Sequence, residues 1–161
     1  MKSVQIENIK AFTTHLFAGE TFDGFLVTEA SFSTLFDLTI DGHMNKDFLN
    51  EEEAEKKENR EGIVYWKRLR PLCYEIIKGQ RVPLRFKLVF LLPPGSYPAF
   101  LSEAGLNYDP SKINGLFLNI NFQDGKLNCT TGSSLKEFSL DRSLEQAWDE
   151  RILKFLGRVQ G

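Results

Sequence analysis

The feature that most constrains this chain is Asp124-Gly125, a turn dipeptide with alternating apolar and polar residues on both sides. Such a dipeptide is typical of the two-residue loop of a type I′ hairpin. A two-residue loop fixes the strand pairing between Leu116 and Ser133. It pairs Phe122 with Leu127, Ile120 with Cys129 and Leu118 with Thr131 on one face, and Asn121 with Asn128 and Asn119 with Thr130 on the other. One face is apolar and the other polar, so the pattern predicts a single register.

Two other segments also have the character of strands. Apolar or small residues occupy alternate positions from Leu26 to Ile40, with no Gly or Pro between residues 25 and 41. This period of two predicts either one long bent strand or two strands divided near residues 31–34. Residues 82–92 are strongly apolar, with Pro83 near their start, and form a further predicted strand. Together with the hairpin, these segments predict a mostly antiparallel sheet of about five strands.

Four segments show helical spacing: residues 6–18, 65–78, 98–104 and 141–157. In the second of them, Pro71 lacks a backbone N–H, so we expect the regular helix to begin near Arg70 with Pro71 in its first turn. Separated helices and a hairpin favour an α+β fold with helices packed on one face of the sheet. The length of 161 residues suits one domain, 1–161, and the sequence contains no internal repeat.

Residues 45–61 form the most polar part of the chain. They contain seven acidic and four basic residues, a net charge of −3, and their only apolar side chains are Phe48, Leu49 and Ala54. A segment of this composition buries too little apolar surface to pack by itself. We therefore expect a charged, mobile or partly helical excursion within the domain.

A basic cluster follows the excursion. Seven cationic residues lie between residues 67 and 87, with Glu75 as the only acid, which gives a local charge of +6 in a chain of net charge −2. Aromatic residues at positions 65, 66, 74 and 86 alternate with them, and cations beside aromatic rings are typical of sites that bind phosphates or stack bases. The predicted anion-binding or partner-binding residues are Lys67, Arg68, Arg70, Lys78, Arg81 and Arg85.

Two purely structural arrangements produce the same charge pattern. These cations are also expected if they form the solvated side of a helix and a strand, or if the acidic excursion lies across them and screens their charge. Our leading hypothesis is a non-catalytic binding or interaction domain that uses residues 65–87 and is gated by residues 45–61. Its partner would be an anionic ligand or a protein. The net charge gives no general attraction to nucleic acid or membrane, so nucleic acid is disfavoured.

One strand offers an alternative, a metal-assisted hydrolase. Asp37, Asp41 and His43 occupy alternate positions along the polar face of this strand and the turn that follows it, a pattern that could supply metal ligands. A strand face that simply contacts solvent is also expected to carry such polar residues. There is no GxSxG elbow, no GxGxxG and no Walker A sequence. We therefore assign no catalytic residue, metal ligand or cofactor, and favour a protein that is not an enzyme. A third hypothesis is a subunit of a homo- or hetero-oligomer that uses the polar hairpin face or a strand edge.

Cysteine usage and the N-terminus bear on location. Cys73 and Cys129 are isolated thiols without a CxxC spacing, and counting alone leaves a disulfide between them open. Two cysteines at this length do not resemble a secreted disulfide scaffold. The first residues lack the basic start and apolar run of a signal peptide, and no stretch approaches 18 apolar residues. We expect a cytoplasmic protein without a membrane span.

Two runs of the sequence resemble a known group of proteins. Residues 39–45, Thr-Ile-Asp-Gly-His-Met-Asn, and 77–84, Ile-Lys-Gly-Gln-Arg-Val-Pro-Leu, are similar to those of a small bacterial protein family of unknown function. The resemblance extends over most of the chain. It implies a bacterial, cytoplasmic, stand-alone domain, and it carries no activity, cofactor or catalytic residue.

Overall fold

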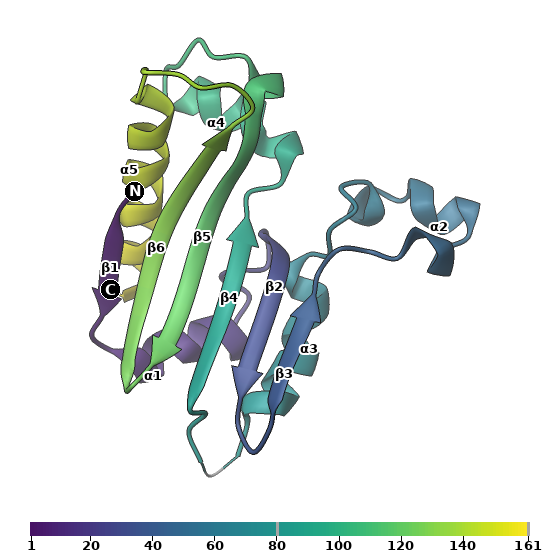
Figure 1. The fold of residues 1–161 in the computed structure, drawn as a ribbon, viewed down its shortest axis with the longest axis vertical. Helices are drawn as coiled ribbons and strands as arrows, with labels where there is room; N and C mark the ends of the chain where they lie inside the picture. The colour runs from purple at the N-terminus through teal and green to yellow at the C-terminus, as the bar shows by residue number, and fades with distance from the viewer. Residues whose placement is uncertain (80, 161) are drawn as a thin grey trace.

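A computed structural model describes residues 1–79 and 81–160 and shows a six-stranded antiparallel sheet (Figure 1). The strands lie in the order β1-β6-β5-β4-β2-β3. Their bounds are β1 Ser3–Ile6, β2 Leu26–Ser33, β3 Asp37–Asp41, β4 Arg85–Leu91, β5 Ile113–Gln123 and β6 Lys126–Leu135. The predicted α+β fold with an antiparallel sheet is confirmed, with six strands in place of about five. The unexpected strand is β1, whose four residues, Ser-Val-Gln-Ile, alternate between polar and apolar but end where the helical spacing from Ile6 begins.

The hairpin of β5 and β6 has the predicted register. Phe122 pairs with Leu127, and the pairing continues without a shift as far as Gly115 with Ser134. Asp124 and Gly125 have φ values of 52° and 73°, the left-handed conformations that a type I′ turn requires. Local turn chemistry and the apolar face therefore specify the same arrangement.

Residues 25–41 form two strands, one of the two predicted arrangements. β2 and β3 pair as a hairpin, from Ser33 opposite Asp37 to Glu29 opposite Asp41. The turn between them exposes Leu35 by 96% and Phe36 by 64%. The alternating pattern continues through this turn in sequence, so the pattern alone does not reveal the break.

The helices are α1 Ile9–Thr13, which a π-helical turn Thr14–Ala18 continues, α2 Glu51–Glu55, α3 Trp66–Ile77, α4 Tyr97–Glu103 and α5 Ser143–Gln160. The predicted start of α3 near Arg70 is wrong, because the helix begins at Trp66 and Pro71 lies inside it. The indole of Trp66 is fully buried and donates to the carbonyl of Leu16 at 2.9 Å, which anchors the first turn. That packing outweighs the one hydrogen bond that Pro71 removes. None of the described helices has the length and apolarity of a membrane span.

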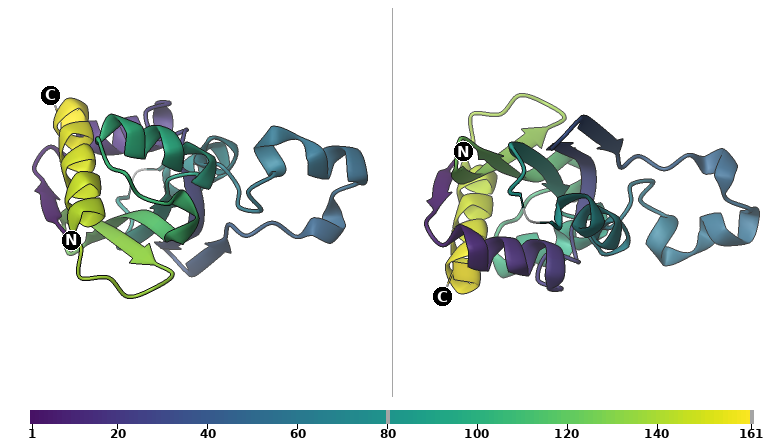
Figure 2. Two further views of the ribbon diagram at one scale, coloured as in Figure 1. Left: turned by 90° about the horizontal axis from the view of Figure 1, so that it is seen from above. Right: turned by 90° about the horizontal axis from the view of Figure 1, so that it is seen from below.

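Except for α2, the helices pack on one face of the sheet, as predicted, and the core lies between them and the strands (Figure 2). Phe86, Leu88 and Phe90 of β4 point into this core, whereas Arg85 and Lys87 are exposed on the other face. That open face is polar and is turned toward the viewer in Figure 1. Functional residues on the two faces are therefore separated by the sheet.

Residues 45–61 project from the end of β3 as an arm (Figures 1 and 2). The arm contains α2 and two 3-10 turns, Lys46–Phe48 and Lys57–Asn59, so the predicted partial helicity is present. Backbone bonds from Met44 to Gly62 at 2.8 Å and from Val64 to Gly42 at 2.9 Å hold its two ends together. The mobility of the arm stays a prediction.

Candidate functional site

The six predicted basic residues do not form one surface. Lys67, Arg68 and Arg70 belong to α3, which packs on the helix-covered side of β2. Arg85 begins β4 and is exposed on the open face, because the neighbouring Phe86 points into the core. The sheet therefore separates the helical part of the cluster from its strand part.

Most of these cations have a carboxylate partner on the protein. The pairs are Arg70 with Asp23 at 2.8 and 3.0 Å, Arg68 with Glu58 at 3.3 Å, Lys78 with Glu75 at 2.6 Å and Arg85 with Asp37 at 3.8 Å. The hydrogen bond to Asp23 raises the pKa of Arg70 above its ordinary value. In residues 1–79 and 81–160, only Lys67 and Arg81 of the six have no carboxylate within 4.0 Å. The local charge that the sequence shows is thus largely compensated in the fold.

Two of the four aromatic residues in the basic cluster are unavailable for stacking. Trp66 and Phe86 belong to the core, whereas Tyr74 is 42% exposed. The acidic arm reaches α3 at Arg68, whose guanidinium also donates to Asn59 at 3.1 Å. The rest of the arm extends away from the sheet (Figure 2). Trp66 and Phe86 thus serve the core, whereas Lys67 and Arg81 keep charges that no described carboxylate meets.

The two carboxylates proposed for a metal-assisted hydrolase, Asp37 and Asp41, are too far from each other to share a metal ion. Asp41 accepts from His43 at 2.6 Å, and the hydrogen bonds from His43 lower the pKa of this carboxyl. Asp37 lies four residues away on the same strand, roughly 13 Å at the rise of a β-strand, and faces Arg85. Among the described residues, no three His, Cys, Asp or Glu side chains come close enough to share a metal ion.

The two thiols are protected by burial. Cys73 and Cys129 are both buried and free. The disulfide between them, which the number of cysteines alone allowed, is therefore not formed. Burial raises the pKa of each thiol to about 12. Both side chains therefore stay protonated at neutral pH and behave as small apolar residues.

The structure creates a concave site of about 530 Å³ that we call the apolar pocket. It lies where α1, the segment after α3 and the β5–β6 turn meet. One wall is Ile9, Lys10 and Thr13 of α1, and another is Ile77 with residues 79 and 81–83. Its volume and mostly apolar walls are typical of pockets that hold small molecules.

The floor of the apolar pocket is aromatic and buried. The antiparallel register of β4 and β5 sets Phe86 opposite Phe122, and their rings stack at 5.3 Å with an interplanar angle of 20°. Phe17 meets Phe86 edge-on at 5.4 Å. All three side chains are at most 6% exposed, so the floor is part of the hydrophobic core.

The rim of the pocket is cationic. Lys10 and Arg81 are its ionisable side chains, and the described part of the chain places no carboxylate within 4.0 Å of either. Val82, which also lines the pocket, is 74% exposed, and Leu84 nearby is 67% exposed. The apolar surface thus continues outward past the mouth. The site combines an apolar floor with positive charge at its entrance.

The sequence indicates one residue of this site and does not reveal the others. Arg81 is among the predicted binding residues, whereas Lys10 stands out only as part of a helix. The phenylalanines of the floor are expected in the core, and nothing local in the sequence indicates that one edge of them is open. The pocket joins segments that are far apart in the chain, so a pattern search along the sequence does not find it.

Comparison with known proteins identifies a family that this chain matches. A protein family described as a family of unknown function (DUF5721) matches residues 15–160. This range includes the aromatic floor and Arg81 but not the part of α1 that carries Lys10. Neither the curated proteins nor the solved structures contain a match to the chain.

Proposed function

The chain belongs to this family of unknown function, and we propose that it is a non-catalytic domain that binds a small apolar molecule bearing one anionic group. One observation carries the proposal. The apolar pocket opens onto Phe17, Phe86 and Phe122, while both of its ionisable side chains, Lys10 and Arg81, are cationic. The best-matching class of ligand is a medium-length aliphatic carboxylate.

Both parts of such a ligand have a physical counterpart in the pocket. Burial of an aliphatic chain against the phenylalanine floor contributes about 25 cal/mol per Å² of apolar surface. The carboxylate would stay at the rim beside Lys10 and Arg81, where it keeps part of its hydration and avoids the cost of a fully buried charge. The pocket's hydroxyl, on Thr13, already donates to the carbonyl of Lys10 at 3.0 Å. These features support binding more than catalysis.

The proposal includes the setting expected from the sequence: a bacterial, cytoplasmic, single-domain protein with an arm at residues 45–61 that is mobile. Two free, buried thiols support a reducing compartment. Cell fractionation of the native host with an antibody to the protein tests the location. Recovery in the extracellular fraction would contradict it.

Titration calorimetry with decanoate and decanol tests the binding function. We expect decanoate to bind wild-type protein at least tenfold more tightly than decanol, because only decanoate pairs with the cationic rim. A tenfold difference corresponds to about 1.4 kcal/mol, within reach of two charged contacts. Equal affinities for both probes, or no binding of decanoate, would overturn the proposal.

Two rim variants and two matched controls locate the effect. Lys10→Gln and Arg81→Gln should each weaken decanoate binding about three- to tenfold and leave decanol binding unchanged. Lys136→Gln and Arg142→Gln remove the same charges elsewhere on the surface and should leave both probes unaffected. A loss of affinity that is the same in rim and control variants would indicate only a general effect of net charge.

A further inference from the structure

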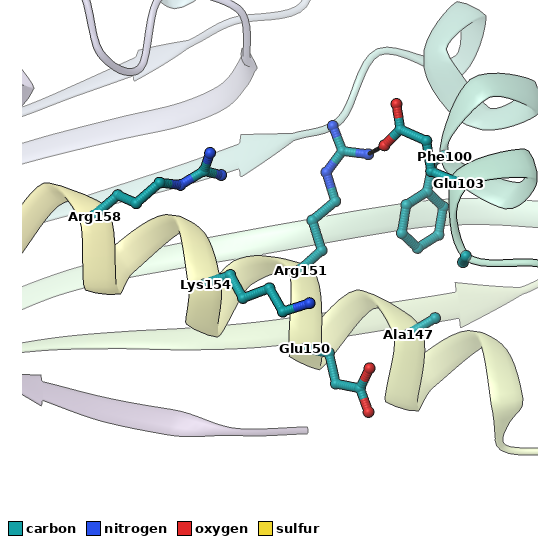
Figure 3. A pocket seen from close by; sticks show the side chains of 8 residues that line it. Phe100, Glu103, Ala147, Glu150, Arg151, Lys154 and Arg158 are labelled. Atoms are coloured by element: carbon teal, nitrogen blue, oxygen red, sulfur yellow. Dashed lines mark hydrogen bonds and ion pairs between the residues drawn. The ribbon is translucent and has the colours of Figure 1, made fainter.

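A second concave region lies along α5, and we call it the α5 groove (Figure 3). It consists of two hollows, of about 420 and 300 Å³, which share Arg151 and Arg158 in their linings. Phe100 of α4 stands on one side, and Phe25 and Phe155 line the other hollow. None of these residues belongs to the apolar pocket, so the two sites are separate.

Three cations line this groove from successive turns of one helix. Arg151, Lys154 and Arg158 are spaced by three and four residues, which places them on one side of α5. Figure 3 shows them in a row along the helix. The spacing is visible in the sequence, but only the fold shows that a hollow lies beside these cations.

Two carboxylates, Glu103 and Glu150, line the first hollow with the three cations, so the charges of the groove are only partly compensated. Arg151 contacts Glu103 at 3.4 Å and lies 5.4 Å from the centre of the Phe100 ring. Both partners of this ion pair are well exposed, at 41% and 73%, so it is a weak contact that a ligand can displace. Within the described residues, no carboxylate lies within 4.0 Å of Lys154 or Arg158.

We propose that the α5 groove binds a small molecule bearing a phosphate group. The planar guanidinium forks of Arg151 and Arg158 match phosphate oxygens bidentately, and Lys154 adds a third positive charge. Thr21 and Ser96, which carry hydroxyls, line the same groove beside the aromatic surface that would contact the organic part. The first hollow is lined by these three cations and by two carboxylates, Glu103 and Glu150, so positive charge is in excess there. That excess favours an anionic ligand with a phosphate group.

Calorimetric titration with inorganic pyrophosphate tests this site. The double variant Arg151→Gln/Arg158→Gln should bind pyrophosphate at least tenfold more weakly than wild type. A control that removes equal charge elsewhere, Arg60→Gln/Arg142→Gln, should change binding less than about twofold. No binding by wild type, or equal weakening in both double variants, would overturn the proposal.

A second variant should change the affinity for pyrophosphate in the opposite direction. Glu103→Gln removes the carboxylate that competes for Arg151, so pyrophosphate should bind about two- to fivefold more tightly. Glu137→Gln, an exposed acid elsewhere, is the matched control. An equal gain in both variants would contradict a built site and indicate a general charge effect. Decanoate binding should be unchanged in Arg151→Gln/Arg158→Gln, so the two proposals can fail independently.

Discussion

Replacement of Gly42 by alanine should destabilise the protein by about 3 kcal/mol or more, the largest effect we expect from one methyl group. A Cβ atom at this position would lie 1.7 Å from the carbonyl oxygen of Val27 and 2.8 Å from its carbon. The backbone there has little freedom to move, because Val27 donates to Val64 and Gly42 donates to Thr28, both at 2.9 Å. Urea denaturation followed by circular dichroism measures the change.

A glycine on α5 supplies the control. A Cβ at Gly157 would meet nothing within 4 Å, and the residue lies inside the helix Ser143–Gln160. Alanine is the better helix former by about 0.8–1.0 kcal/mol, so Gly157→Ala should stabilise the protein by up to that amount. A Gly42→Ala variant whose free energy of unfolding stayed within about 0.5 kcal/mol of wild type would contradict the close approach of β2 to this glycine.

The second large effect concerns the ion pair of Asp23 and Arg70. Asp23→Asn should lower the free energy of unfolding by about 2–3 kcal/mol, because it leaves a mostly buried guanidinium without its counter-charge. The two side chains are only 12% and 16% exposed and are joined by two hydrogen bonds. Chemical denaturation at pH 7 measures the loss.

An exposed ion pair on the same helix is the control for this substitution. Glu75→Gln breaks the contact of Glu75 with Lys78, whose side chains are 59% and 51% exposed, and should cost less than about 0.5 kcal/mol. If Asp23→Asn were equally harmless and also created a new pyrophosphate site, Arg70 would be a binding residue and our structural assignment would be wrong.

The fold could be predicted where local chemistry and tertiary packing agree. The hairpin at Asp124-Gly125 and the apolar stripe of α5 each specify their own element, so sequence reasoning identifies both. Sequence reasoning fails where contacts between residues far apart in the chain determine whether an element forms and where it begins. The first turn of α3 is anchored by the bond from Trp66 to Leu16, and β1 exists through its pairing with β6.

The candidate site was less predictable for the same reason. Counting charges along the chain finds a basic cluster but does not reveal Asp23, Glu58 or Asp37, which compensate it from other elements. In the described structure no such partner approaches Lys67 or Arg81, and of these two only Arg81 lines the apolar pocket. The pocket beside it depends on how α1 meets the paired strands β4 and β5, which only the folded chain reveals.

The most direct test of our central claim is a two-dimensional amide NMR titration of ¹⁵N-labelled protein with decanoate. We predict that the largest shifts occur at Thr13, Val82 and Gly125, which line three sides of the apolar pocket. Amides of α5 should shift little. Shifts centred on α5, or scattered over the surface without saturation, would contradict a ligand site at the apolar pocket.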